Sequence, residues 1–63
     1  MAIRRVFIWD TQQDIDVSEA AGASWIAQGD YRGERIIAHG VDELSAVRKW
    51  VALARALGGP NEW

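Results

Sequence analysis

The chain has 63 residues, a formal net charge of -2, no cysteine and a single histidine. It therefore has no disulfide and too few ligands for a cysteine and histidine zinc site, so apolar packing must hold it together. Hydrophobic residues make up 49% of the chain and include four tryptophans, which predicts one small folded domain over residues 1–63. The charge balance gives no general attraction for nucleic acid or anionic lipid. Because no apolar run is long enough for a membrane span or a signal peptide, we expect a cytoplasmic protein without membrane contact.

The N-terminal third of the chain predicts one strand and one connection. Residues 3–9 concentrate branched and aromatic side chains, which favour a strand. Residues 10–23 are polar and acidic, and Ile15 and Val17 alternate there with acids. Such a segment is either a short edge strand or a mobile loop, and it is longer than most connections in compact domains.

The middle of the chain predicts a hairpin. Residues 24–30 and 34–39 have the composition of its two strands, and residues 30–33 have that of the turn between them. Gly33 can adopt the positive φ that a tight turn often needs.

The C-terminal segment predicts a helix over residues 42–57. Asp42 is a suitable N-cap residue, and the Gly-Gly-Pro run at residues 58–60 is typical of a helix end. Trp50 lies in the middle of the apolar helical face, and Trp25 lies on the hairpin, so both are expected in the core. These elements in order predict an α+β fold with a three-stranded antiparallel sheet followed by one C-terminal helix, in two layers.

Adjacent large apolar side chains occur in all three predicted strands. Because strand side chains alternate between the two faces of a sheet, such pairs place apolar groups on both faces, and one helix covers only one of them. The surplus apolar surface predicts a non-enzymatic protein that acts through protein-protein contact, either with a partner or as a homodimer. The expected interface residues are Phe7, Trp9, Ile26 and Ile37, although the sequence does not decide which register of the strands faces outward.

Two patterns in the sequence carry a resemblance to a known family. Residues 25–36 read W-x-A-x-G-x-Y-x-G-E-x-I, and residues 46–58 read A-V-x-x-W-x-x-x-A-R-x-x-G. With these patterns the chain resembles a family of short uncharacterised bacterial proteins, many of them from rhizobia. The resemblance implies a bacterial protein and supports the predicted fold, but it implies no specific activity.

Two other functions remain open at this point. Three-stranded sheets backed by a helix read DNA in the plant ethylene-response domain and in phage integrase arm-binding domains, and a similar use here would make Arg32 and Arg35 nucleic-acid contacts. The acids of residues 10–19 alternatively suit an inhibitor, encoded by a mobile element, that occupies a nucleic-acid site on another protein. No catalytic, cofactor-binding or metal-binding residue is expected, because no such motif has the required spacing.

Overall fold

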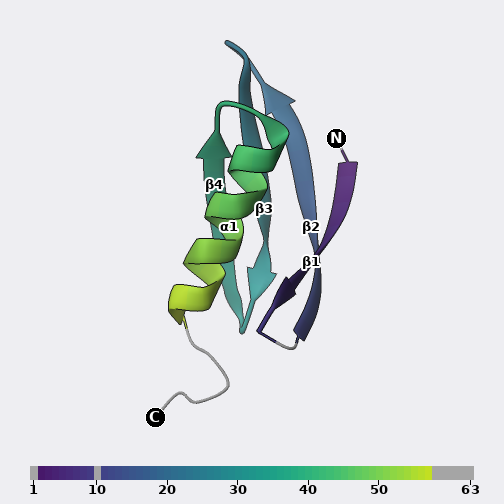
Figure 1. The fold of residues 1–63 in the computed structure, drawn as a ribbon, viewed down its shortest axis with the longest axis vertical. Coiled ribbons are helices and arrows are strands. Elements are labelled where there is room, and N and C mark those ends of the chain that lie inside the picture. Colours follow the sequence, from purple (N-terminus) through teal and green to yellow (C-terminus); the bar gives the residue numbers. More distant parts are fainter. Residues whose placement is uncertain (1, 10, 58–63) are drawn as a thin grey trace.

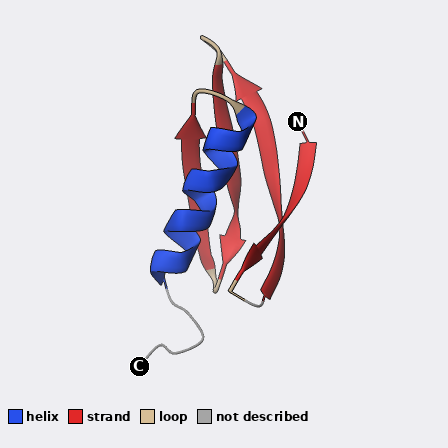
Figure 2. Ribbon diagram, viewed as in Figure 1, coloured by secondary structure: helices blue, strands red, loops and turns tan. Residues whose placement is uncertain are grey.

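The computed structural model describes residues 2–9 and 11–57. Four antiparallel strands follow one another as neighbours in one sheet, β1 (Ala2–Ile8), β2 (Thr11–Ala20), β3 (Ser24–Tyr31) and β4 (Glu34–Gly40). One helix, α1 (Glu43–Leu57), follows and lies across one face of the sheet (Figure 1 and Figure 2). The α+β class and the C-terminal helix are as predicted. The prediction of three strands is wrong, because the sheet has four.

The additional strand is the acidic segment for which the sequence predicted either an edge strand or a loop. β2 pairs with β1 on one side and with β3 on the other, so it is a central strand. Ile15 and Val17 are buried under the helix, whereas Asp14 and Asp16 point to the opposite face. The alternation of apolar and acidic residues therefore marks a strand with one buried face and one open face.

The predicted hairpin of β3 and β4 is confirmed. Its two turn residues, Arg32 and Gly33, have positive φ values of 55° and 81°. Two positive values in succession are characteristic of the tight type I′ turn, whose twist matches that of the flanking strands. The first strand differs slightly from its prediction, because it ends at Ile8 and Trp9 enters the turn to β2 with a φ of 58°.

The helix begins where the N-cap predicts. The carboxylate of Asp42 accepts a hydrogen bond from the Ser45 backbone amide at 2.7 Å, which satisfies one of the free amide groups of the first turn. The predicted stop signal at residues 58–60 lies outside the described residues, as does Trp63.

One face of α1 packs on the sheet with a four-residue period. Ala46, Trp50 and Ala54 are fully buried. The indole Nε1 of Trp50 also donates a hydrogen bond to the Ile36 carbonyl oxygen at 3.0 Å. Trp25 packs against the same core while remaining partly exposed, so the core placement of both tryptophans is confirmed.

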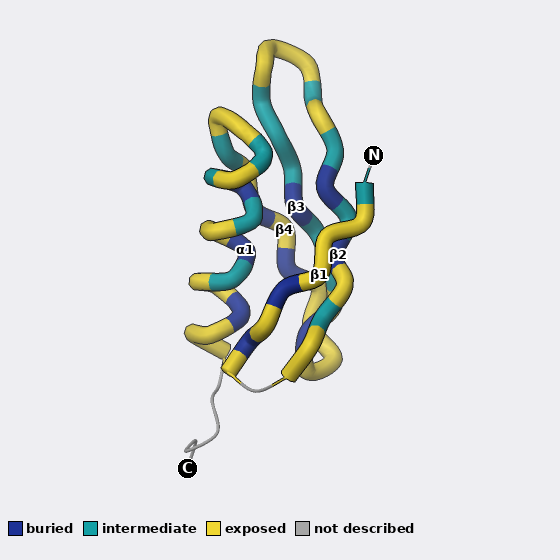
Figure 3. The backbone as a smooth tube through the Cα atoms, turned by 45° about the vertical axis from the view of Figure 1, so that its right-hand side comes forward, coloured by how far each residue is buried: buried dark blue, intermediate teal, exposed yellow. Residues whose placement is uncertain are grey.

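The core lies between α1 and the sheet face that we call the inner face. Its buried residues alternate along each strand, and they are Val6, Ile8, Ile15, Val17, Ala27, Tyr31, Ile36 and Ala38, with Ala46, Trp50 and Ala54 from the helix. Figure 3 shows this alternation of buried and exposed positions along the backbone. α1 makes most of its contacts with β4 and β3 and fewer with β1 and β2, so the helix lies toward the β4 edge. No other described element covers the opposite, outer face.

Candidate interaction surface

The outer face is polar along its centre and cationic at its edges. In one row across the sheet, Arg5 of β1 lies opposite Asp14 of β2, and Asp30 of β3 lies opposite Arg35 of β4. The side-chain N–O distances are 3.4 Å for the first ion pair and 3.6 Å for the second. These pairs are exposed, so each contributes little to stability. Their arrangement nevertheless places negative charge on the two central strands and positive charge on the two edge strands.

The exposed apolar side chains of the outer face lie on its two edge strands. Phe7 on β1 is 60% exposed and Ile37 on β4 is 49% exposed, whereas Ile26 on β3 is partly buried. Sequence reasoning missed Ile3, which is 63% exposed on β1 and lies across the sheet from Ile37, with Asp16 and Gln28 between them. The prediction that strands carry apolar groups on both faces is confirmed. These groups do not form one continuous patch, because a polar strip separates the two edges.

The predicted interface residue Trp9 lies apart from the other three. It occupies the turn between β1 and β2 and is 45% exposed. The Arg55 guanidinium carbon lies 5.4 Å from the centroid of its ring, a geometry suited to a cation–π interaction. Trp9 therefore contacts the last turn of α1 rather than joining Phe7 on the outer face.

A groove runs along the β4 edge, beneath the adjoining side of α1. It has a volume of about 420 Å³ and is lined by Ile37, Ala38, His39, Lys49, Ala52 and Leu53. The walls are mostly apolar, and Leu53 of the helix is 47% exposed. The groove joins an unpaired strand edge to an exposed apolar side of the helix, a combination that suits protein contact.

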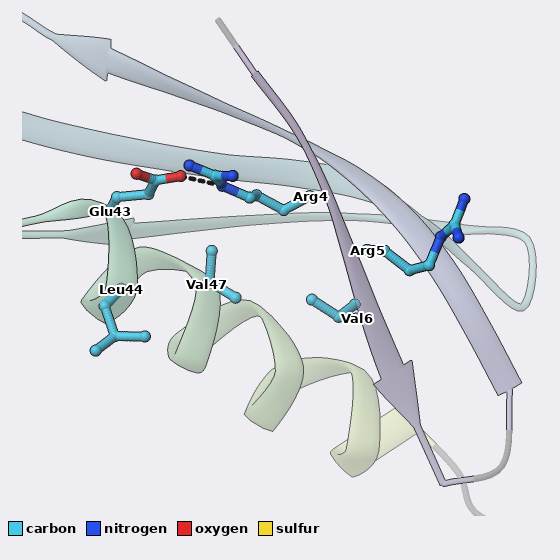
Figure 4. Close-up of a pocket in the computed structure, with 6 residues that line it drawn as sticks. All are labelled: Arg4, Arg5, Val6, Glu43, Leu44 and Val47. Carbon is cyan, nitrogen blue, oxygen red and sulfur yellow. Dashed lines mark hydrogen bonds and ion pairs between the residues drawn. The ribbon is translucent and has the colours of Figure 1, made fainter.

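The β1 edge carries a different groove, which Figure 4 shows. It has a volume of about 300 Å³ and is lined by Arg4, Arg5, Val6, Glu43, Leu44 and Val47. Arg4 reaches from β1 to Glu43 in the first turn of α1 and forms an ion pair with it, whereas Arg5 points to the other side of the strand. The hydrogen bond from Arg4 lowers the pKa of Glu43 below its ordinary value. This ion pair joins the edge strand to the helix at the end where α1 begins.

The residues expected for the two other functions are dispersed. Arg32 lies in the turn between β3 and β4, while Arg35 is paired with Asp30 and donates a hydrogen bond to the Gln28 side chain at 3.3 Å. Of the acids proposed for an inhibitor, Asp14 and Asp16 share the outer face. Glu19 lies opposite Trp25, on the inner face of the sheet. No group of acids and histidines among residues 2–9 and 11–57 has the geometry of a metal site.

Comparisons with known proteins give no relative: no family model, no curated protein and no solved structure matches the chain. The resemblance to the rhizobial-type family stays a prediction. Within the part of the chain that the structure describes, no helix has both the length and the apolar character needed to cross a bilayer.

Proposed function

We propose that this protein is a small non-enzymatic module that acts through protein-protein contact, and that its first partner is a second copy of itself. The supporting observation is that the core is closed while large apolar side chains remain at the sheet edges. Ile3, Phe7 and Ile37 are each about half exposed or more, although each lies beside a well-packed strand. Exposed apolar groups gathered at strand edges are typical of surfaces that bind other proteins.

The charge pattern gives less support to the nucleic-acid alternative. A sheet that binds phosphates needs a surplus of cations on its binding face. Here the central strands place Asp14, Asp16 and Asp30 on the outer face, and Arg35 is engaged with one of these acids.

A concentration series by sedimentation equilibrium tests the proposal. We expect the weight-average mass to rise from the monomer value of 7.0 kDa toward twice that value over the micromolar range. A mass that stays at the monomer value up to high micromolar concentration would contradict self-association. Gel-shift titrations at low salt against random duplex and single strands test the alternative, for which we expect no shifted band.

Substitutions at the edges show which apolar groups matter. Phe7→Ser and Ile37→Ser each remove an exposed side chain from one edge, so the substitution that weakens association identifies the edge in contact. Val41→Ser is the matched control, because Val41 is 81% exposed but belongs to the short connection between β4 and α1. If association survives both edge substitutions unchanged, the apolar edges do not mediate it.

A further inference from the structure

We propose that two copies of the chain pair through their β4 strands, antiparallel and centred on Ile37, to form one continuous eight-stranded sheet. This inference rests on the proposed self-association and specifies its geometry. It uses an open strand edge as the contact, which supplies backbone hydrogen bonds in addition to side-chain packing.

The two strand edges differ in how well they are protected against such pairing. A charged residue that points to the buried side of an edge strand hinders the addition of another strand. β1 carries Arg4 in that position, held by its ion pair with Glu43. In the middle of β4 the corresponding positions are occupied by Ile36 and Ala38, which carry no charge, and the one charged residue on this side, Glu34, lies at the end of the strand beside the turn. β4 is therefore the less protected edge.

The sequence of β4 is compatible with its own reverse. In an antiparallel pair centred on Ile37, this residue faces Ile37 of the second copy on the outer face. On the inner face, Ile36 faces Ala38 of the second copy, so both cores continue across the junction. On the outer face, Arg35 then lies opposite His39 of the second copy.

Stacking of two outer faces is a poorer solution. The row of Arg5, Asp14, Asp30 and Arg35 has the charge order plus, minus, minus, plus. If two outer faces stack about a two-fold axis through the centre of this row, each charge of the row faces a like charge of the second copy. Asp16 adds to the cost, because its Oδ1 atom is buried and accepts no hydrogen bond from the described residues. Covering the face would remove the rest of this carboxylate from water, which costs free energy unless the second copy supplies a hydrogen-bond donor.

The β4 pairing also brings opposite charges together. Centred on Ile37, it places Glu34 of the second copy opposite Gly40. Lys49 lines the groove at the β4 edge, and side chains of a helix incline toward its N-terminus, which lies at the Gly40 end of β4. Among the described residues neither Glu34 nor Lys49 has an ion-pair partner. The dimer would therefore form two symmetric pairs between Lys49 and Glu34, while Leu53 of each helix would lie beside the new junction.

Cysteine crosslinking tests the register directly, because the chain contains no cysteine. Residues directly opposite in antiparallel strands have Cα atoms about 4.5–5.5 Å apart, within the range that a disulfide bridges. We expect Ile37→Cys to form a disulfide-linked dimer under mild oxidation of the folded protein. Arg35→Cys alone should not, whereas a mixture of Arg35→Cys and His39→Cys should form the mixed dimer. Ile3→Cys is the exposed control on the other edge.

Charge reversal provides a second test that does not touch the apolar contact. We expect Lys49→Glu and Glu34→Lys each to weaken dimerisation on the order of tenfold, and the double variant to restore it. Both residues are exposed, so their substitution leaves the core unchanged. If the unmodified chain dimerises but Ile37→Cys does not crosslink and charge reversal has no effect, the β4 geometry is wrong and self-association stands. If the unmodified chain is monomeric, both proposals fail.

Discussion

The packing of α1 against Gly40 predicts that a single methyl group there destabilises the fold. A Cβ atom at residue 40 would lie 2.8 Å from the Ser45 carbonyl carbon and 2.9 Å from the Ala46 Cα, and it would also meet the Ala46 amide nitrogen. Ordinary contacts between carbon atoms lie at about 3.5–4.0 Å, so the methyl group is roughly 0.6–1.2 Å too close. All three neighbours are backbone atoms of the first helical turn, which no change of side-chain rotamer can move away. Gly40 does not have a positive φ, so Gly40→Ala adds this clash without backbone strain.

The cost of Gly40→Ala follows from the need to shift the start of α1. Inserting a carbon into a well-packed core costs about 1–3 kcal/mol, and a clash with backbone places this substitution at the upper end. A domain of 63 residues has a total stability of about 3–9 kcal/mol, so the loss is a large fraction of it. With a urea m-value of about 1 kcal/mol/M, the unfolding midpoint should fall by about 2–3 M.

Urea unfolding followed by circular dichroism measures this effect. Wild type and variants must be compared at one protein concentration, because self-association adds to the apparent stability. Val41→Ala is the matched control: it changes the adjacent exposed residue to the same amino acid, and we expect its free energy of unfolding to stay within about 0.5 kcal/mol of wild type. A Gly40→Ala midpoint as close to wild type as that of the control would show that the helix does not approach Gly40 as described.

Substitutions at three positions test separate contacts of α1 with the same unfolding assay. Asp42→Ala removes the N-cap and should cost about 1 kcal/mol, whereas Asp42→Asn should retain most of the stability; equal losses would refute the cap. Trp50→Phe keeps a buried ring but leaves the Ile36 carbonyl oxygen without its indole donor, and should cost about 1–2 kcal/mol; no loss would refute the hydrogen bond. The hydrogen bond from Arg4 lowers the pKa of Glu43 from its ordinary value of 4.5, so its stabilisation is present above pH 4.5 and is lost as the pH falls through the lower folded-state pKa. Glu43→Gln should therefore be less stable than wild type at pH 7, and the difference should vanish well below pH 4.5; a difference that persists in acid would contradict the assignment.

Local chemistry was a reliable guide wherever the deciding interaction lies within a few residues. Asp42 caps the helix four residues before the first buried alanine, and Gly33 supplies the positive φ of its turn. The alternation of Ile15 and Val17 with acids was visible as well, and it correctly indicated a possible strand. The segment did not predict that this strand is central, because its pairing with β1 and β3 depends on residues outside it. Trp9 was assigned to the first strand on its composition, and the structure places it in the turn.

The expected interface residues also combine features that local sequence predicts with features that depend on distant segments. Alternation placed Ile36 and Ile37 on opposite faces without deciding which of them is buried, and the structure buries Ile36 and exposes Ile37. Alternation could not show that Phe7 and Ile37 belong to opposite edges of the sheet, because that separation depends on the presence and order of β2 and β3. The ion pair between Arg4 and Glu43, which distinguishes the two edges, joins residues 39 positions apart and has no local signature.

The amino-acid sequence alone determined the helix and the hairpin turn, because these follow from backbone preferences and side-chain period. Only the tertiary structure decided the four-strand order, the position of α1 toward β4 and the difference between the two edges. These features depend on pairing between distant segments, and many arrangements of the same local elements satisfy the local preferences equally well.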